Sequence, residues 1–210
     1  MIAPMADDIW TLVHAERRAL ATDLGNLSVE QWKTPSLCEG WTIHDVLAHQ
    51  VATASLTPLK FFAGLAGSGF SFTKLGDKQV AAGTAGGPAK TLAAYTALES
   101  ATTSPPGPKV SWLGEELIHG EDIRRPLGLT RAYPADAVSK TLDFYKGSNL
   151  IVGAKKRIAD LQLAATDLSW TTGTGPLVEG PAMSLLMAMT GRKTHLDDLS
   201  GPGLETLRSR

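Results

Sequence analysis

Two acid–histidine pairs at helical spacing are the residues of this sequence with the clearest potential for chemistry. Glu115 precedes His119 by four positions, and Asp45 precedes His49 by the same interval. Residues four apart lie on one face of a helix, so a carboxylate and an imidazole there could share one divalent cation. With 21 acids and 5 histidines in 210 residues, about half of one such pair is expected by chance. Spacing alone therefore leaves two interpretations open: a metal site, or a solvated helix face with an acid–histidine hydrogen bond.

His49 is a possible third ligand. It follows the apolar residues Val46, Leu47 and Ala48, and a lone histidine on an apolar face is more often part of the core boundary than a ligand. Helical bundles nevertheless build metal sites from inward-facing side chains of facing helices. A group of His49, Glu115 and His119 would supply three protein ligands and leave a fourth position open, which is typical of catalytic zinc. His44 is the nearest rival ligand, but it lies about 140° from His49 around an ideal helix.

The neighbours of these residues allow functional and structural interpretations. Asp122, three positions after His119, is either a residue that orients the histidine or a polar residue near the helix end. Cys38 could place a thiol near the site, but a small buried apolar role is favoured. Arg124 and Arg125 fall in the last turn of the helix, where positive charge suits the helix dipole, and we expect them to face outward.

Amphipathic helices are predicted wherever these residues occur. The apolar spacing favours a helix over 7–25 and a second helix from Thr42 to about Thr57, begun by a Thr42–Asp45 capping box. A third helix begins after Pro108 and must end at Pro126. Six glycines in 67–90 indicate a long, mobile connection.

The pattern changes near residue 158. Alternating apolar residues over 161–166 predict a strand, 169–172 a second strand, 173–176 a turn and 181–189 a short apolar helix. We therefore expect a mainly α protein: a helical bundle domain over 1–153 and a small α+β domain over 154–210.

Composition narrows the function classes. The chain is 43% apolar and 20% charged, which is ordinary for a globular protein, and its net charge of -1 argues against a nucleic-acid partner. Its single cysteine excludes an intrachain disulfide and fits a reducing compartment. Residues 1–8 lack a signal-peptide pattern, and no run approaches the roughly 20 apolar residues of a membrane helix. We expect a cytoplasmic protein without a membrane partner.

Three segments resemble blocks of one protein family, in the family's order. Residues 35–49 resemble its first block, which begins with proline and ends G-W-T-x-x-D-V-x-A-H, and residues 115–128 resemble its E-x-x-x-H-x-x-D-x-R-x-P-x-G block. Residues 180–192 and 199–201 resemble its C-terminal block. The family is the DinB-like metalloprotein superfamily and, more narrowly, the mycothiol-dependent maleylpyruvate isomerases of actinobacteria.

The resemblance implies a fold and a site. The fold would be a DinB-like four-helix bundle with a small C-terminal domain. The family's metal ligands correspond to His49, Glu115 and His119, and the metal, usually zinc, would be divalent. The family also needs an arginine in its C-terminal domain, and Arg192 is the best match for that catalytic residue.

The resemblance also implies an activity. The chain would be an enzyme that uses the low-molecular-weight thiol mycothiol to isomerise, or transfer sulfur to, a small electrophile, as a monomer or homodimer. The alternative is a non-enzymatic metal- or ligand-binding DinB-like protein, because a fold does not dictate a function. The sequence assigns no thiol-binding residues and does not separate isomerase from transferase.

Overall fold

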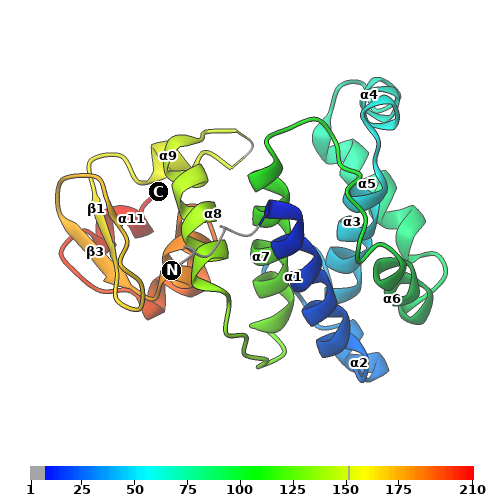
Figure 1. Cartoon of the computed structure of the whole chain (residues 1–210), viewed down its shortest axis with the longest axis horizontal. Coiled ribbons are helices and arrows are strands. Elements are labelled where there is room, and N and C mark those ends of the chain that lie inside the picture. Colours follow the sequence, from blue (N-terminus) through cyan, green and yellow to red (C-terminus); the bar gives the residue numbers. More distant parts are fainter. Residues whose placement is uncertain (1–7, 151) are drawn as a thin grey trace, which may run out of the picture. The chain divides into compact units, whose positions relative to one another are not determined.

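The computed structural model describes residues 8–150 and 152–210, so most of the segment examined for a signal peptide lies outside the described residues. The chain divides into two compact units, Met1–Arg131 and Ala132–Arg210. Figure 1 gives the order of their helices and strands. The division falls before the boundary expected at 153/154, because helix α8 (Ala135–Gly147) packs on helix α10 (Ala182–Met189) of the second unit.

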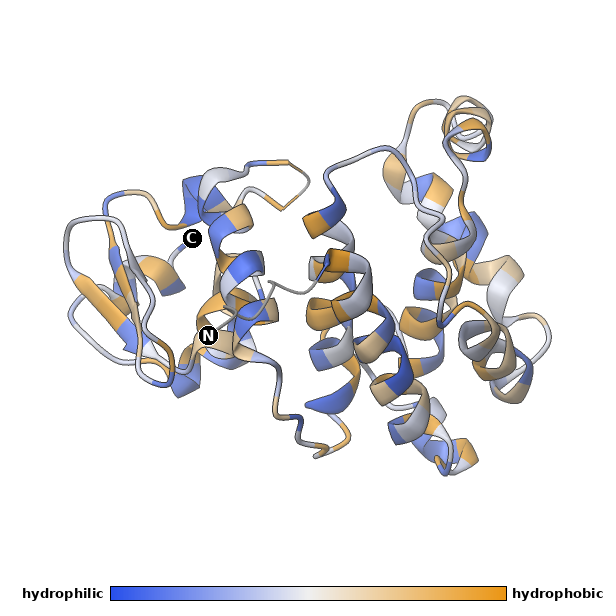
Figure 2. Ribbon diagram, viewed as in Figure 1, coloured by the Kyte–Doolittle hydropathy of each residue, from blue (hydrophilic) through white to orange (hydrophobic). Residues whose placement is uncertain are grey.

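The first unit is a four-helix bundle with additional helices. Helices α1 (Ile9–Leu24), α3 (Ile43–Ser55), α6 (Pro88–Ala97) and α7 (Lys109–Arg124) form a closed ring of packed neighbours: α1 on α7, α7 on α3, α3 on α6, and α6 on α1. The remaining helices are α2 (Val29–Trp32), α4 (Pro58–Ala66) and α5 (Phe72–Thr84). Hydrophobic and hydrophilic residues are interspersed along α1 and α7 (Figure 2), and α7 buries charged residues such as Glu116 and Asp122 as well as apolar ones.

The apolar core of the bundle joins α1, α3, α6 and α7. Its buried side chains share one contiguous cluster, which consists of Leu20, Leu24, Trp32, Ile43, Val46, Leu47, Tyr95 and Ile123. The helix starts follow from local sequence: the capping boxes of Ser28 and Gln31, and of Thr42 and Asp45, are both formed. Pro58 does not kink α3, which ends at Ser55; instead it occupies the first turn of α4, where its missing N–H costs nothing.

The glycine-rich segment 67–90 is where the sequence prediction was wrong. We expected a mobile connection, but the segment contains α5 and the start of α6. Ser71 caps α5 by accepting a hydrogen bond from the backbone N–H of Lys74, and Leu75 and Val80 are buried. A Cβ atom added at Gly83 would lie 2.9 Å from the Cβ of Ala48 on α3. This glycine therefore permits close packing of α5 on the helix that carries His49, rather than flexibility.

The second unit is a small α+β fold. Strand β1 (Gln162–Ala165) is central, with β2 (Thr171–Thr172) antiparallel and β3 (Leu177–Gly180) parallel to it. In register, Leu163 is opposite Thr172 and Val178. The sequence predicted the first two strands and α10 but not β3. The other elements are α9 (Ala154–Arg157), the 3-10 helix η1 (Lys193–Asp198) and α11 (Leu204–Arg208).

The core of the second unit lies around α10, in which Ala182 and the six residues from Ser184 to Met189 are buried. They pack with buried side chains of the sheet and of α8, including Leu142, Leu163 and Val178. The predicted fold class, mainly α with a helical bundle and a small α+β part, is confirmed. No helix in the described part of the chain is long and apolar enough to cross a membrane.

Candidate metal centre

Helices α3 and α7 carry the three residues that the resemblance implies as ligands. The capping box holds the start of α3, where Asp45 Oδ2 accepts hydrogen bonds from the backbone N–H and the hydroxyl of Thr42 at 2.9 and 2.7 Å. Because this carboxylate is engaged in the cap, the candidate pair of Asp45 and His49 is not formed. His49 lies one turn further along α3, with Trp41 beside it at a ring-centroid distance of 5.2 Å.

The side chains of His49, Glu115 and His119 converge between α3 and α7. Glu115 Oε2 lies 3.3 Å from His119 Nε2 and 3.5 Å from His49 Nε2. The two imidazole rings stand edge to face with centroids 5.0 Å apart. The side chains are 13 to 27% exposed, so the group opens to solvent rather than being sealed in the core.

The charges in this group favour an ionised Glu115 beside imidazole. Burial alone would raise the pKa of Glu115, but the polar contacts with His119 and His49 outweigh it and hold the pKa well below its ordinary value. Burial alone would lower the pKa of His119, but its contacts with Asp122, Cys38 and Glu115 raise it well above its ordinary value. Without a cation, these contacts therefore favour the protonated, positively charged form of His119.

Asp122 orients His119 from the side of the imidazole ring that faces away from Glu115. His119 Nδ1 lies 2.9 Å from Asp122 Oδ2, and the Asp122 side chain is fully buried. A histidine that donates its Nδ1 proton to a carboxylate presents the lone pair of Nε2 in the other direction, here toward Glu115. This arrangement of carboxylate, histidine and candidate metal position is typical of histidine ligands in metalloproteins.

Cys38 belongs to the same network, the alternative that the sequence analysis left open but did not favour. Its thiol donates to Asp122 Oδ2 at 3.1 Å, and its sulfur lies 3.7 Å from His119 Nδ1. Its position four residues before Thr42, the cap of α3, gave no signal for this contact. The loop enters the network because the backbone N–H of Leu37 donates to the backbone carbonyl of Asp122 at 3.1 Å.

The donor atoms fit a divalent cation. In each of two groups in the described part of the chain, one donor atom per residue lies within 4.8 Å of the others: His49, Glu115 and His119, and Cys38, His119 and Asp122. In the first group, His49 Nδ1 and Glu115 Oε2 are buried without a hydrogen-bond partner among the described residues. The 3.3 and 3.5 Å contacts to Glu115 are longer than charge-assisted hydrogen bonds. The second group is already joined by hydrogen bonds, so the first is the better candidate.

The structure also places two arginines that the sequence analysis singled out, Arg124 and Arg192. The expectation that Arg124 faces outward is wrong: its side chain is buried and its Nε donates to Asp23 Oδ2 of α1 at 2.7 Å. Arg192 lies in the second unit at the N-terminus of η1, where its Nη1 donates to the carbonyl of Thr190 at 3.1 Å.

A family model and solved structures show which proteins this chain is similar to. The model of the mycothiol maleylpyruvate isomerase N-terminal domain matches residues 13–124, more than half of the chain and the segment that carries all three candidate ligands. The chain belongs to this family. The family assignment made from the sequence is therefore confirmed, and it places the chain in a family of enzymes.

The maleylpyruvate isomerase fold extends over nearly the whole chain. A crystal structure of the mycothiol-dependent maleylpyruvate isomerase is similar with a TM-score of 0.64 at 16% identity, covering 92% of this chain and 91% of that chain. A structure of that isomerase with one histidine replaced by alanine gives a TM-score of 0.61 at 15% identity, with the same coverage. At such identities the likeness establishes a shared fold. A comparison with curated protein sequences gives no match.

Proposed function

We propose that this chain is a divalent-metal-dependent enzyme that uses mycothiol to isomerise a small unsaturated diacid, as a maleylpyruvate isomerase does. The observation that carries the proposal is the convergence of His49 Nε2, His119 Nε2 and Glu115 Oε2 in a chain of this family. A small electrophile and a low-molecular-weight thiol would be its partners, and a cytoplasmic location would suit both.

The three side chains would hold the cation, for which we propose zinc. Imidazole nitrogen and carboxylate oxygen are ordinary zinc ligands, and three of them leave one coordination position for an exchangeable ligand. A bound cation of this kind would favour the thiolate form of a thiol placed beside it. Asp122 keeps the proton of His119 on Nδ1, so that Nε2 remains available, and Trp41 restricts the ring of His49.

The proposed reaction requires no oxidant or reductant. When bound, mycothiol would supply a thiolate that adds reversibly to the cis double bond, so that rotation about the resulting single bond and loss of the same thiolate would give the trans isomer. An arginine such as Arg192 would hold a carboxylate of the diacid through paired hydrogen bonds. An enzyme that released the adduct instead would be a thiol transferase.

The test combines metal content with turnover in the purified full chain. We expect about one divalent ion per chain by elemental analysis, and metal-dependent conversion of a cis-diacid in the presence of mycothiol. His49→Ala should lose metal and turnover while keeping its helical circular dichroism. His14→Ala is the control, because His14 lies on α1 outside the group and contacts the carbonyl of Ala101.

The outcomes separate the enzyme from its alternatives. Metal binding without turnover of a panel of cis-diacids, epoxides and halides would favour a non-enzymatic binding protein. A stable mycothiol adduct would favour a transferase. Full metal content in His49→Ala would remove this residue from the site. Light scattering of the same samples would distinguish a monomer from a homodimer.

A further inference from the structure

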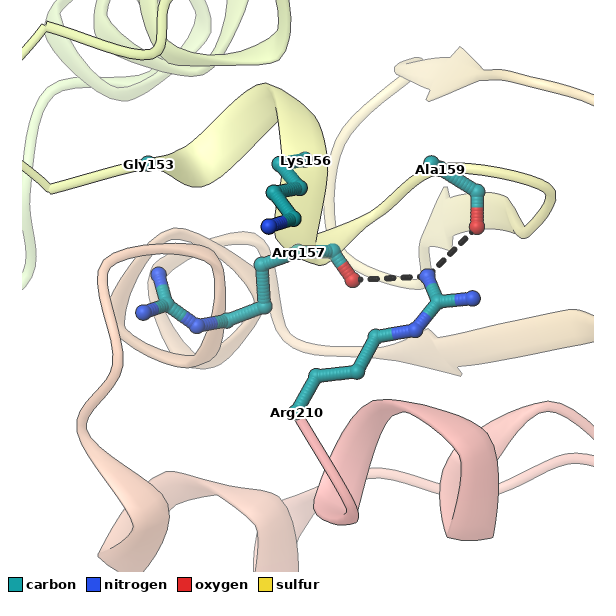
Figure 3. A pocket seen from close by; sticks show the side chains of 5 residues that line it. All are labelled: Gly153, Lys156, Arg157, Ala159 and Arg210. Carbon is teal, nitrogen blue, oxygen red and sulfur yellow. Dashed lines mark hydrogen bonds between the residues drawn. The ribbon is translucent and has the colours of Figure 1, made fainter.

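A second concave site lies within the C-terminal unit. Figure 3 shows a pocket of about 540 Å³ lined by Gly153, Lys156, Arg157, Ala159 and Arg210. Its volume falls within the range of small-molecule sites. Three of the five lining residues are cationic, and they come from two places in the chain: the α9 turn and the segment after α11.

The backbone around the pocket is held by the arginines themselves. Arg210 donates through Nη1 to the carbonyls of Arg157 and Ala159 at 3.0 and 2.5 Å (Figure 3). Arg157 donates through its own Nη1 to the carbonyls of Val152 and Met189 at 2.9 and 2.6 Å. These bonds satisfy one nitrogen of each guanidinium with neutral acceptors and leave both positive charges uncompensated.

The pocket has no compensating negative side chain. Within the described part of the chain, no acidic residue lines it, and Lys156, Arg157 and Arg210 have no carboxylate within salt-bridge distance. Some other cations of the unit are paired: Arg208 contacts Asp197, and Lys146 contacts Asp143. The pocket, in contrast, gathers three cations that have no carboxylate partner among the described residues.

An adjoining hollow extends the cationic surface. It has a volume of about 160 Å³, shares Arg157 and Arg210 with the first pocket, and adds Arg192 and Lys193. Burial and the nearby charge of Arg192 lower the pKa of Arg157. Like charges gathered in a partly desolvated site repel one another, and an anion between them would relieve that repulsion.

We propose that this pocket binds a small molecule carrying at least two anionic oxygen groups, with Lys156, Arg157 and Arg210 as its cationic contacts. Carboxylates and phosphates share this chemistry, and guanidinium groups bind both through paired hydrogen bonds. Several cations select a dianion over a monoanion, because each additional charge pairs with a further positive group. The site lies within one unit and does not depend on the metal centre.

Isothermal titration calorimetry of the full chain at low ionic strength tests the proposal. The probes are inorganic phosphate and, separately, succinate, with acetate as the monoanion. We expect saturable binding of at least one dianion and weaker binding of acetate. Lys156→Gln should weaken dianion binding about tenfold, and Arg210→Gln should have a similar effect. Lys156→Gln is the easier substitution to interpret, because the Lys156 side chain makes no hydrogen bond within the described residues that the change would remove.

The chain offers a matched control on the same turn. Lys155 is exposed, carries the same charge and does not line the pocket, so Lys155→Gln should change dianion binding less than about twofold. His49→Ala should leave binding unchanged, which separates this site from the metal centre. Binding of only phosphate or only succinate would identify the oxyanion and support the site. The proposal is overturned if neither dianion saturates, if Lys155→Gln matches Lys156→Gln, or if His49→Ala abolishes binding.

Discussion

Gln50 Nε2 donates a hydrogen bond to Glu116 Oε2 at 3.2 Å, and each of these buried residues directly follows a proposed metal ligand. Gln50 follows His49 on α3, and Glu116 follows Glu115 on α7. The bond therefore ties α3 and α7 together one residue away from the proposed metal ligands. It fixes the axial position of α3 relative to α7 at the level where the proposed ligands converge.

Glu116 also joins the remaining helices of the bundle. Its carboxylate accepts hydrogen bonds from Arg17 of α1 and from the hydroxyl of Tyr95 of α6, both at 2.7 Å. Burial raises the pKa of Glu116, and the charge of Arg17 and the bond from Tyr95 oppose that rise without cancelling it. Four helices thus meet at one buried carboxylate.

Removing this carboxylate should destabilise the bundle. Glu116→Ala leaves Arg17 buried beside unpaired donors, so we expect the free energy of unfolding to fall by about 3–5 kcal/mol in urea denaturation. Glu99→Ala removes a surface partner of Arg18 and should cost less than about 1 kcal/mol. Equal losses in the two variants would show that the buried network contributes nothing beyond a surface ion pair.

Asp122 should control how tightly the metal is held. Asp122→Asn keeps the side-chain shape but removes the charge beside His119 Nδ1, so we expect metal affinity to weaken about 10–100-fold. Competition with a chelator measures the change. Cys38→Ser is the control, because serine can still donate to Asp122, and we expect nearly unchanged affinity. If Cys38→Ser releases the metal and His49→Ala does not, the cation occupies the group of Cys38, His119 and Asp122.

His44 should introduce a pH dependence into stability that is separate from the metal centre. Burial lowers the pKa of His44 below its ordinary value of 6.5, with Asp45 opposing, and its Nε2 contacts the hydroxyl of Thr91 at 2.8 Å. The unfolded chain therefore takes up this proton at a higher pH than the folded chain. The free energy of unfolding should decrease as pH falls below 6.5, and this contribution should level off below the folded pKa.

The comparison with His44→Gln isolates this effect. Glutamine can still contact Thr91 but does not titrate, so the stability difference between wild type and variant should be constant above pH 6.5. Below that pH the difference should move in favour of the variant. Urea denaturation from pH 5 to 8 measures it, and a difference independent of pH would remove His44 as the cause.

Arg192→Lys tests the proposed carboxylate contact. Lysine keeps the charge but loses the planar fork, so turnover with mycothiol and a diacid should fall by at least about tenfold while metal content stays unchanged. Arg208→Lys makes the same change on α11 and should preserve activity. Unchanged turnover in Arg192→Lys would show that Arg192 does not contact the substrate, and that the residues of the bundle bind it without this arginine.

Helix α3, which carries His49, was predictable because its signals are local. The capping box of Thr42 and Asp45 and the apolar spacing that follows need only neighbouring residues, and both appear in the structure. The spacing of Glu115 and His119 likewise predicts a shared helix face. That His49 faces this pair from another helix is a tertiary fact, which here required the family resemblance.

The failures of prediction also have physical causes. Gly83 indicates flexibility in the sequence, but its contact with Ala48 lies 35 positions away in the chain. Cys38 and Arg124 look like a small apolar residue and a surface cation until their partners Asp122 and Asp23 are brought beside them. In each case the deciding partner comes from a different element, so no local pattern could identify it.

The separation of the proposed ligands along the chain would make the amount of folded protein in the cell depend on metal availability. His49 and Glu115 belong to α3 and α7, with three helices between them, so an unfolded chain cannot present the complete group. A cation that binds only the folded bundle adds about 1.4 kcal/mol to its stability for each tenfold excess over its dissociation constant. Metal starvation would then do more than silence the site: it would raise the unfolded fraction and expose the chain to proteases.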